Sequence, residues 1–163
     1  MHAEPTRFEQ AGRRRLAHPP PIDHHNRSII IFLTACTKNR RPILASPAMH
    51  SLIRSTWIDA NHWLIGRYVL MPEHIHLFCA PGHIPAKPLA NWIRFWKSEI
   101  SKATGAGEDS FWQRDHWDTQ LRQSESYVAK WEYVRNNPVR AGLVARSEDW
   151  PYQGELNVLR WHG

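Results

Sequence analysis

Apolar positions along the chain recur in two periods, and together they predict an ordered series of strands and helices from residue 28 onward. Runs rich in β-branched and other apolar residues predict three strands, at 28–37, 63–71 and 75–80. An aromatic and basic run at 110–117 predicts a fourth strand with its turn. Apolar residues at helical spacing predict three helices, at 47–61, 89–104 and 125–136.

The order of these elements is strand, helix, strand, strand, helix, strand and helix, which is the split βαβ pattern of ferredoxin-like folds. We therefore predict an α+β fold in which an antiparallel sheet carries helices on one face and is followed by a C-terminal helix. The 163 residues contain no internal repeat, so we expect a single domain at 27–163. A basic, proline-rich arm at 1–26 precedes it, either loosely draped or touching phosphates.

Each predicted helix has an apolar face for the core. Ser46 before Pro47 predicts an N-cap for the first helix, whose core face comprises Met49, Leu52, Ile53, Trp57 and Ile58. The core face of the second comprises Leu89, Trp92, Ile93, Trp96 and Ile100, and that of the third Val128, Trp131 and Val134. Off the stripe of the second helix lie Arg94, Lys97 and Lys102, which form either a solvated face or a phosphate-facing surface.

The segment YVLMPEHIHLFCAP places two histidines at the start of a strand. Residues i and i+2 of a strand point to the same face, so His74 and His76 are expected to project together while Ile75 enters the opposite, apolar layer. Neighbouring imidazoles are natural metal ligands, although most His-x-His pairs are accidental. This pair alone therefore leaves metal binding open.

A second polar pair lies in the last long helix, where Tyr133 and Asn137 are four residues apart and share a helical face. If that face lies against the histidine strand, two imidazoles and the Asn137 amide oxygen make an open three-ligand site. Nitrogen and oxygen ligands together suit Mn²⁺, or Mg²⁺ with waters. The Tyr133 phenol is then a candidate nucleophile. The alternatives are a core tyrosine for Tyr133 and an N-cap before Pro138 for Asn137.

Composition favours a polyanionic partner. Lys and Arg outnumber Asp and Glu by 21 to 15, and the isoelectric point is near 9.7. The two cysteines, Cys36 and Cys79, lie in apolar runs and are expected to be reduced core residues. No signal peptide and no long apolar run is visible, so we expect a cytoplasmic, nucleoid-associated protein with no membrane partner.

Three further segments accompany the histidine motif MPEHIHLF: WQRD, EYVRNNPVRAGLV and SEDWPY. Joined in this order, they resemble the REP-associated tyrosine transposases, domesticated relatives of the single-strand insertion-sequence transposases in the HUH nuclease superfamily. The resemblance spans roughly residues 13–152. One departure is Thr119, where many members of the family carry the histidine of an Asp-His pair.

The resemblance implies a function for each motif. His74 and His76 would be metal ligands for Mg²⁺ or Mn²⁺, completed by Asn137, and Tyr133 on a C-terminal catalytic helix would be the nucleophile. The substrate would be single-stranded DNA hairpins of REP-type palindromes, cleaved and rejoined through a 5′-phosphotyrosine. Members of this family look more like monomers than helix-swapped dimers. Our candidates for DNA backbone contacts, beyond the resemblance, are Arg94, Lys97, Arg114 and Arg135.

Two other functions fit the sequence. A ferredoxin-like sheet can also serve as a non-catalytic DNA- or RNA-binding module, because a fold alone does not settle function. A zinc hydrolase using His74, His76 and Cys79 is the third hypothesis. Metal-dependent cleavage of DNA would distinguish the nuclease from the non-catalytic binding module. Tightly held zinc in the purified protein would indicate the zinc hydrolase.

Overall fold

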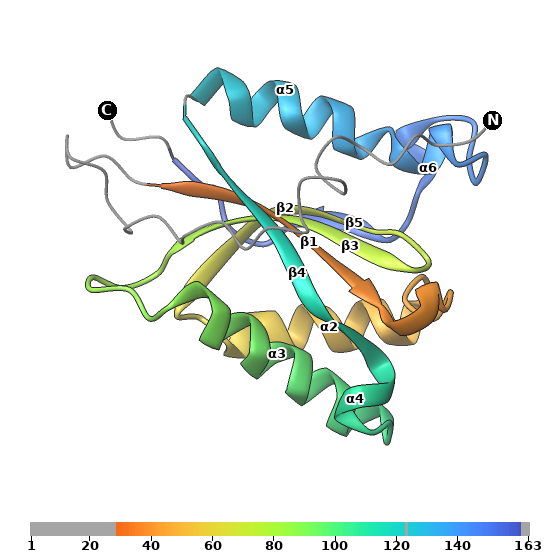
Figure 1. Ribbon diagram of the computed structural model, residues 1–163. Coiled ribbons are helices and arrows are strands. Elements are labelled where there is room, and N and C mark those ends of the chain that lie inside the picture. Colours follow the sequence, from red (N-terminus) through yellow and green to blue (C-terminus); the bar gives the residue numbers. More distant parts are fainter. Residues whose placement is uncertain (1–28, 123, 161–163) are drawn as a thin grey trace.

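The structure is a computed structural model that describes residues 29–122 and 124–160. Five antiparallel strands form one sheet in the order β4-β1-β3-β2-β5 (Figure 1). Their bounds are β1 Ile30–Thr37, β2 Trp63–Leu70, β3 His74–Pro81, β4 Trp112–Leu121 and β5 Gln153–Glu155. The predicted arm at 1–26 lies outside the described residues.

Helices lie on both sides of the sheet (Figure 1). On one side are α2 (Pro47–Asp59), α3 (Leu89–Thr104) and the short α4 (Glu108–Phe111), and on the other are α5 (Ser124–Arg135) and α6 (Asn137–Arg140). Two short 3₁₀ helices, η1 (Lys38–Arg40) and η2 (Ser147–Asp149), complete the fold. The predicted α+β class, with an antiparallel sheet and a C-terminal helix, is confirmed.

Strand alternation creates two apolar layers. In β1 and β3, Leu33, Ile75 and Leu77 enter the larger layer, which is shared with α2 and α3. Phe32 and Phe78 enter the smaller layer, where Trp131 and Val134 of α5 pack against them. Helix α5 is therefore held on the sheet by its own apolar residues, and the face of β3 that carries Phe78 is the face beneath α5.

The predicted helices are confirmed to within two residues at their ends, and Ser46 accepts a hydrogen bond from the Met49 amide as the N-cap of α2. The predicted face of α3 is buried in full, which places Trp92 and Trp96 in the core. Two of the other predicted core positions are wrong. Ile58 and Val128 are 60% and 59% exposed.

Lys97 is a larger correction, because it lies in the core rather than on a positive solvent side of α3. It is 8% exposed, and its ammonium donates a hydrogen bond to the Gln113 carbonyl and lies 5.9 Å from the centre of the Trp112 ring. Burial lowers the pKa of Lys97 from 10.5 to about 8. A side chain in this position cannot serve as the exposed DNA contact that its place in the helical pattern indicated.

The Lys97 pKa predicts how stability depends on pH. Below pH 8 the Lys97 ammonium stays charged in the native state, and its burial lowers the free energy of unfolding by the full desolvation cost. Between pH 8 and 10.5 the native state releases the proton that the unfolded chain still binds, so stability rises with pH. Relative to Lys97→Met, the wild type should gain about 2 kcal/mol of unfolding free energy between pH 7 and 9.5. Urea unfolding at both pH values measures this difference, and parallel curves for the two proteins would contradict it.

The sheet extends beyond the sequence-based prediction at both edges. Strand β4 continues to Leu121 along β1, four residues past the predicted end at 117. Strand β5 pairs with Arg67 to Val69 of β2, and the sequence pattern did not predict it. Trp150, just before it, is 8% exposed and donates its indole hydrogen to the Leu70 carbonyl. The tail therefore closes one edge of the sheet.

Candidate active site

The two histidines at the start of β3 point to the same face, as the strand period predicts. His74 and His76 are 8% and 4% exposed, and their Nε2 atoms lie 3.1 Å apart. His76 stacks on Phe32 of the α5 layer, with ring centres 5.3 Å apart and planes inclined by 23°. The pair therefore opens toward the sheet face that α5 covers, while Ile75 enters the opposite core.

The outer nitrogen of each ring has its own partner. His74 Nδ1 lies 2.8 Å from Glu73 Oε1, and His76 Nδ1 lies 2.8 Å from Thr34 Oγ1 of the neighbouring strand β1. An ionised carboxylate only accepts hydrogen bonds, so the His74 proton belongs on Nδ1 and its Nε2 lone pair faces His76. The His74 bond in turn lowers the pKa of Glu73. These partners fix both rings with their Nε2 atoms converging.

This nitrogen pair fits a divalent cation. Two nitrogen ligands at a right angle, each about 2.1 Å from one ion, are about 3 Å apart, close to the observed separation. Burial and the charges of His74, Lys130 and Arg140 lower the pKa of His76 well below its usual value. His76 is therefore neutral at physiological pH, the form that binds metals. Among the described side chains, no group of three or more His, Cys, Asp or Glu is arranged to hold a metal.

Tyr133 lies on the same side of the sheet as the histidine pair. It is 46% exposed on α5, so it is not a core tyrosine. The Lys130 ammonium lies 5.5 Å from the centre of the Tyr133 ring and 4.7 Å from that of Phe32, which stacks on His76. One lysine therefore contacts both the phenol and the aromatic ring that supports the histidines. Tyr133 is thus linked to His76 through Lys130 and Phe32.

Asn137 is the first residue of α6, and Asn136 occupies the N-cap position without a side-chain capping bond. The N-cap alternative for Asn137 is therefore wrong. The Asn137 amide oxygen Oδ1 accepts a hydrogen bond from the Arg140 guanidinium. An amide oxygen has two lone pairs, so this bond leaves one for another partner. The structure thus places Asn137 in α6, beyond the end of the helix that carries Tyr133, and joins it to Arg140.

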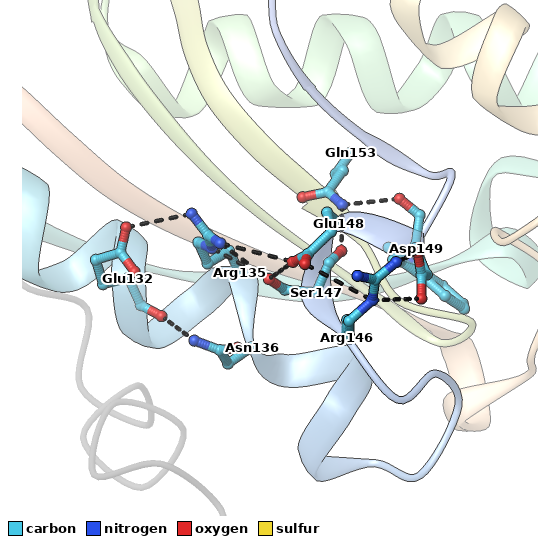
Figure 2. Close-up of polar contacts among 9 residues, drawn as sticks. Glu132, Arg135, Asn136, Arg146, Ser147, Glu148, Asp149 and Gln153 are labelled. Carbon is cyan, nitrogen blue, oxygen red and sulfur yellow. Dashed lines mark hydrogen bonds and ion pairs between the residues drawn. The ribbon is translucent and has the colours of Figure 1, made fainter.

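A polar network anchors the end of α5 (Figure 2). Arg135 donates hydrogen bonds to Ser147 Oγ of η2 and to Glu132 of its own helix, and it lies 3.9 Å from Glu148. Ser147 is 5% exposed. Because these contacts fix the last turn of α5, Arg135 positions the helix that carries Tyr133. The sequence proposed it as a DNA contact, and the structure gives it this positioning function.

The remaining candidate DNA contacts lie on other elements than the histidine pair. Arg94 is exposed on α3, which covers the opposite face of the sheet. Arg114 is exposed on the edge strand β4. Thr119, the position where the chain departs from the family pattern, pairs with Phe32 in the register of β1 and β4. Residue 119 therefore lies one strand from the ring that stacks on His76.

Several residues of the site escaped sequence reasoning. Thr34 and Phe32 reach the pair only through the pairing of β1 with β3, in which Thr34 lies opposite His76. Lys130 precedes Tyr133 by three residues, and this helical spacing was a usable signal. Arg140 lies within the recognised segment NPVRAGLV but has no motif of its own. Glu73 lies within the histidine motif MPEHIHLF and directly precedes His74, but nothing in the sequence assigned it a function.

Cys79 is excluded from the site by strand alternation. It is fully buried in the layer shared with α2 and α3, on the face opposite His74 and His76. Burial raises the pKa of its thiol well above the usual value. The zinc hydrolase with Cys79 as a ligand is therefore wrong, whereas the expectation of two reduced, buried cysteines is confirmed.

No helix in the described part of the chain is long and apolar enough to span a membrane.

Comparison with known proteins agrees with the motifs. No family model matches the chain. A REP-associated tyrosine transposase of Escherichia coli K12 is 27% identical over 124 residues, covering 74% of this chain and 73% of the relative. A putative REP-associated tyrosine transposase of Haemophilus influenzae is 26% identical over 97 residues, covering 51% and 53% of the two chains.

A solved structure shares the fold. It is that of a REP-associated tyrosine transposase bound to a REP hairpin, and it matches 86% of this chain and 80% of its own with a TM-score of 0.69 at 23% identity. Its fold agrees with the five-stranded antiparallel sheet and its flanking helices. The similarities in sequence and the shared fold show that the chain is a relative of the REP-associated tyrosine transposases, the family its motifs resemble.

Proposed function

We propose that this protein cleaves and rejoins single-stranded DNA through a 5′-phosphotyrosine intermediate, in a reaction that needs a divalent cation, Mg²⁺ or Mn²⁺. Its substrates would be hairpins of REP-type palindromes, the kind of DNA bound in the related solved structure. The observation that supports the proposal is that Tyr133 and the histidine pair lie on the same face of the sheet. The Lys130 ammonium lies near both the Tyr133 ring and the Phe32 ring, which stacks on His76.

In the proposed reaction, the Tyr133 phenolic oxygen attacks a backbone phosphorus atom. A bond forms between this oxygen and phosphorus, the bond from phosphorus to the 3′ oxygen breaks, and the phenol's proton is balanced by protonation of the departing oxygen. The products are a 5′-phosphotyrosine and a free 3′-hydroxyl. Because the ester linkage is conserved, a 3′-hydroxyl from another strand reverses the step without ATP.

His74 and His76 would hold the cation through their Nε2 atoms, with Glu73 and Thr34 fixing the rings. Asn137 would add its amide oxygen through the lone pair that Arg140 does not use. A bound divalent cation supplies charge stabilisation to the non-bridging oxygens of a phosphate. The protein ligands are all neutral, so the full positive charge is available to the DNA.

We also propose that Tyr133 serves the histidine pair of its own chain, so that the protein acts as a monomer. Trp131 and Val134, on either side of Tyr133, are 9% and 1% exposed in the layer formed with Phe78. These contacts join α5 to the sheet of the same chain. Exchange of α5 between two chains would first separate this apolar layer, which costs free energy in proportion to the area exposed.

Covalent capture tests the proposed function. The probe is a REP-type hairpin labelled on the fragment that carries the 5′-phosphate after cleavage. When Mg²⁺ or Mn²⁺ is present, it should form a protein–DNA band that resists denaturing detergent. EDTA should abolish this band because the histidine pair then lacks its cation. The measurement is a denaturing gel, with DNA affinity followed in parallel by fluorescence anisotropy. Binding without any adduct in either cation would favour the alternative, a non-catalytic nucleic-acid-binding module on the same fold.

A further inference from the structure

Two cations lie close to the Tyr133 ring. The Arg140 guanidinium lies 4.0 Å from the centre of that ring, and the Lys130 ammonium lies 5.5 Å from it. The two come from different helices, α6 and α5, which follow one another along the chain on the same side of the sheet (Figure 1). The phenol therefore has two positive charges beside it.

Contacts link the same two cations to the proposed metal site. The Lys130 ammonium lies 4.7 Å from the centre of the Phe32 ring, which stacks on His76. The Arg140 guanidinium donates a hydrogen bond to Asn137 Oδ1. Each cation therefore lies near the Tyr133 ring and also contacts a residue beside or within the proposed metal site.

The two cations are close enough to influence one another. Burial and the charge of Arg140 lower the pKa of Lys130 from 10.5 to about 8. A planar guanidinium stacked on an aromatic ring still presents its edge, where its N–H groups fit a phosphate.

We propose that Lys130 and Arg140 form a phosphate-binding pair that holds a phosphodiester of single-stranded DNA beside Tyr133 without help from a metal. This inference rests on the proposed function for the identity of the ligand. It assigns DNA contacts to α5 and α6 around the histidine pair, in place of Arg94 and Lys97 on the other side of the sheet.

DNA binding in EDTA tests the pair apart from the chemistry. The probe is a fluorescent single-stranded REP-type hairpin, and its affinity is measured by anisotropy over a range of salt concentrations. Lys130→Gln and Arg140→Gln should each weaken binding about tenfold. Each should also reduce the slope of log affinity against log salt by about 0.7, the value for one phosphate contact on a single strand. Lys130→Arg should restore the slope.

The matched control is Lys102→Gln, which removes the same charge from α3 on the opposite face. Lys102 is 74% exposed there, so its affinity and salt slope should equal those of the wild type. A merely structural role for Lys130 would change the melting temperature but leave the slope of the folded protein unchanged. If Arg140→Gln does not fold, the Lys130 variants and Arg140→Lys, which keeps the charge, decide the question.

The outcomes separate this inference from the proposed function. If the wild type captures DNA covalently but both neutral variants keep its affinity and slope in EDTA, the phosphate-binding pair is overturned and the nuclease stands. If the variants lose affinity and slope but no adduct ever forms, the pair stands and the chemistry fails. A wild type that binds no single-stranded DNA overturns both.

Discussion

Replacing Tyr133 with phenylalanine is expected to abolish covalent capture of a hairpin while changing DNA affinity by less than about twofold. The substitution removes one oxygen, the proposed nucleophile, and keeps the aromatic ring. Arg140 and Lys130 contact the face of that ring rather than its hydroxyl, so both cations keep their support. The adduct is measured on a denaturing gel, and affinity by anisotropy in EDTA.

Tyr127→Phe provides the control in the same helix. The chain has four tyrosines, and Tyr127 lies on α5 two turns before Tyr133. Its hydroxyl accepts a hydrogen bond from the Arg67 amide, 3.2 Å away, and the other side of its ring packs on Phe78. It is therefore a structural phenol, and its loss should leave the adduct intact. An adduct that survives Tyr133→Phe and disappears in Tyr127→Phe would move the nucleophile to Tyr127.

The backbone periods account for what the sequence predicted correctly. The side-chain period of a strand is two, so the common face of His74 and His76 follows from their spacing alone. The apolar stripe of α3 has the period of a helix, and all five predicted residues are buried. Helical spacing did not hold for Tyr133 and Asn137, because α5 ends at Arg135 and Asn137 begins α6.

Long side chains and strand pairing account for what the sequence did not predict. Lys97 lies one residue from the apolar stripe, and its four-carbon chain reaches the Gln113 carbonyl across the core surface. Helical spacing predicts the position of a Cα atom around the helix. It does not predict where the ammonium at the end of a long, flexible side chain lies. Thr34 meets His76 only because β1 and β3 pair in one register out of several. Periodicity within one strand carries no information about that register.

The positions of charged side chains in the fold were likewise not predictable from the sequence. The excess of basic residues indicated a polyanionic partner, but the four candidates, Arg94, Lys97, Arg114 and Arg135, lie on three different elements. The cations that do lie together, Lys130 and Arg140, are joined by their contacts with a single phenol. Net charge is a property of composition, whereas a binding site needs charges held at one place by packing.

The second large effect is expected at the histidine pair. Replacing His76 with asparagine should abolish both Mn²⁺ binding and covalent capture, because one imidazole remains and no other described group of His, Cys, Asp or Glu can complete a site. Glu73→Gln should have a smaller effect, a loss of about 10- to 100-fold in metal affinity. It keeps an acceptor for His74 Nδ1 and removes only the charge.

Mn²⁺ binding, measured by electron paramagnetic resonance of the free ion, gives a result that does not depend on DNA. His50→Gln is the control, because His50 lies on α2 and bonds to the Tyr68 hydroxyl at 2.7 Å, on the other side of the sheet. It should bind Mn²⁺ like the wild type. Since His76 is buried against Phe32, thermal unfolding of His76→Asn is measured alongside. A folded His76→Asn protein that still binds Mn²⁺ and still forms the adduct would place the cation elsewhere, and with it the phosphate that Tyr133 attacks.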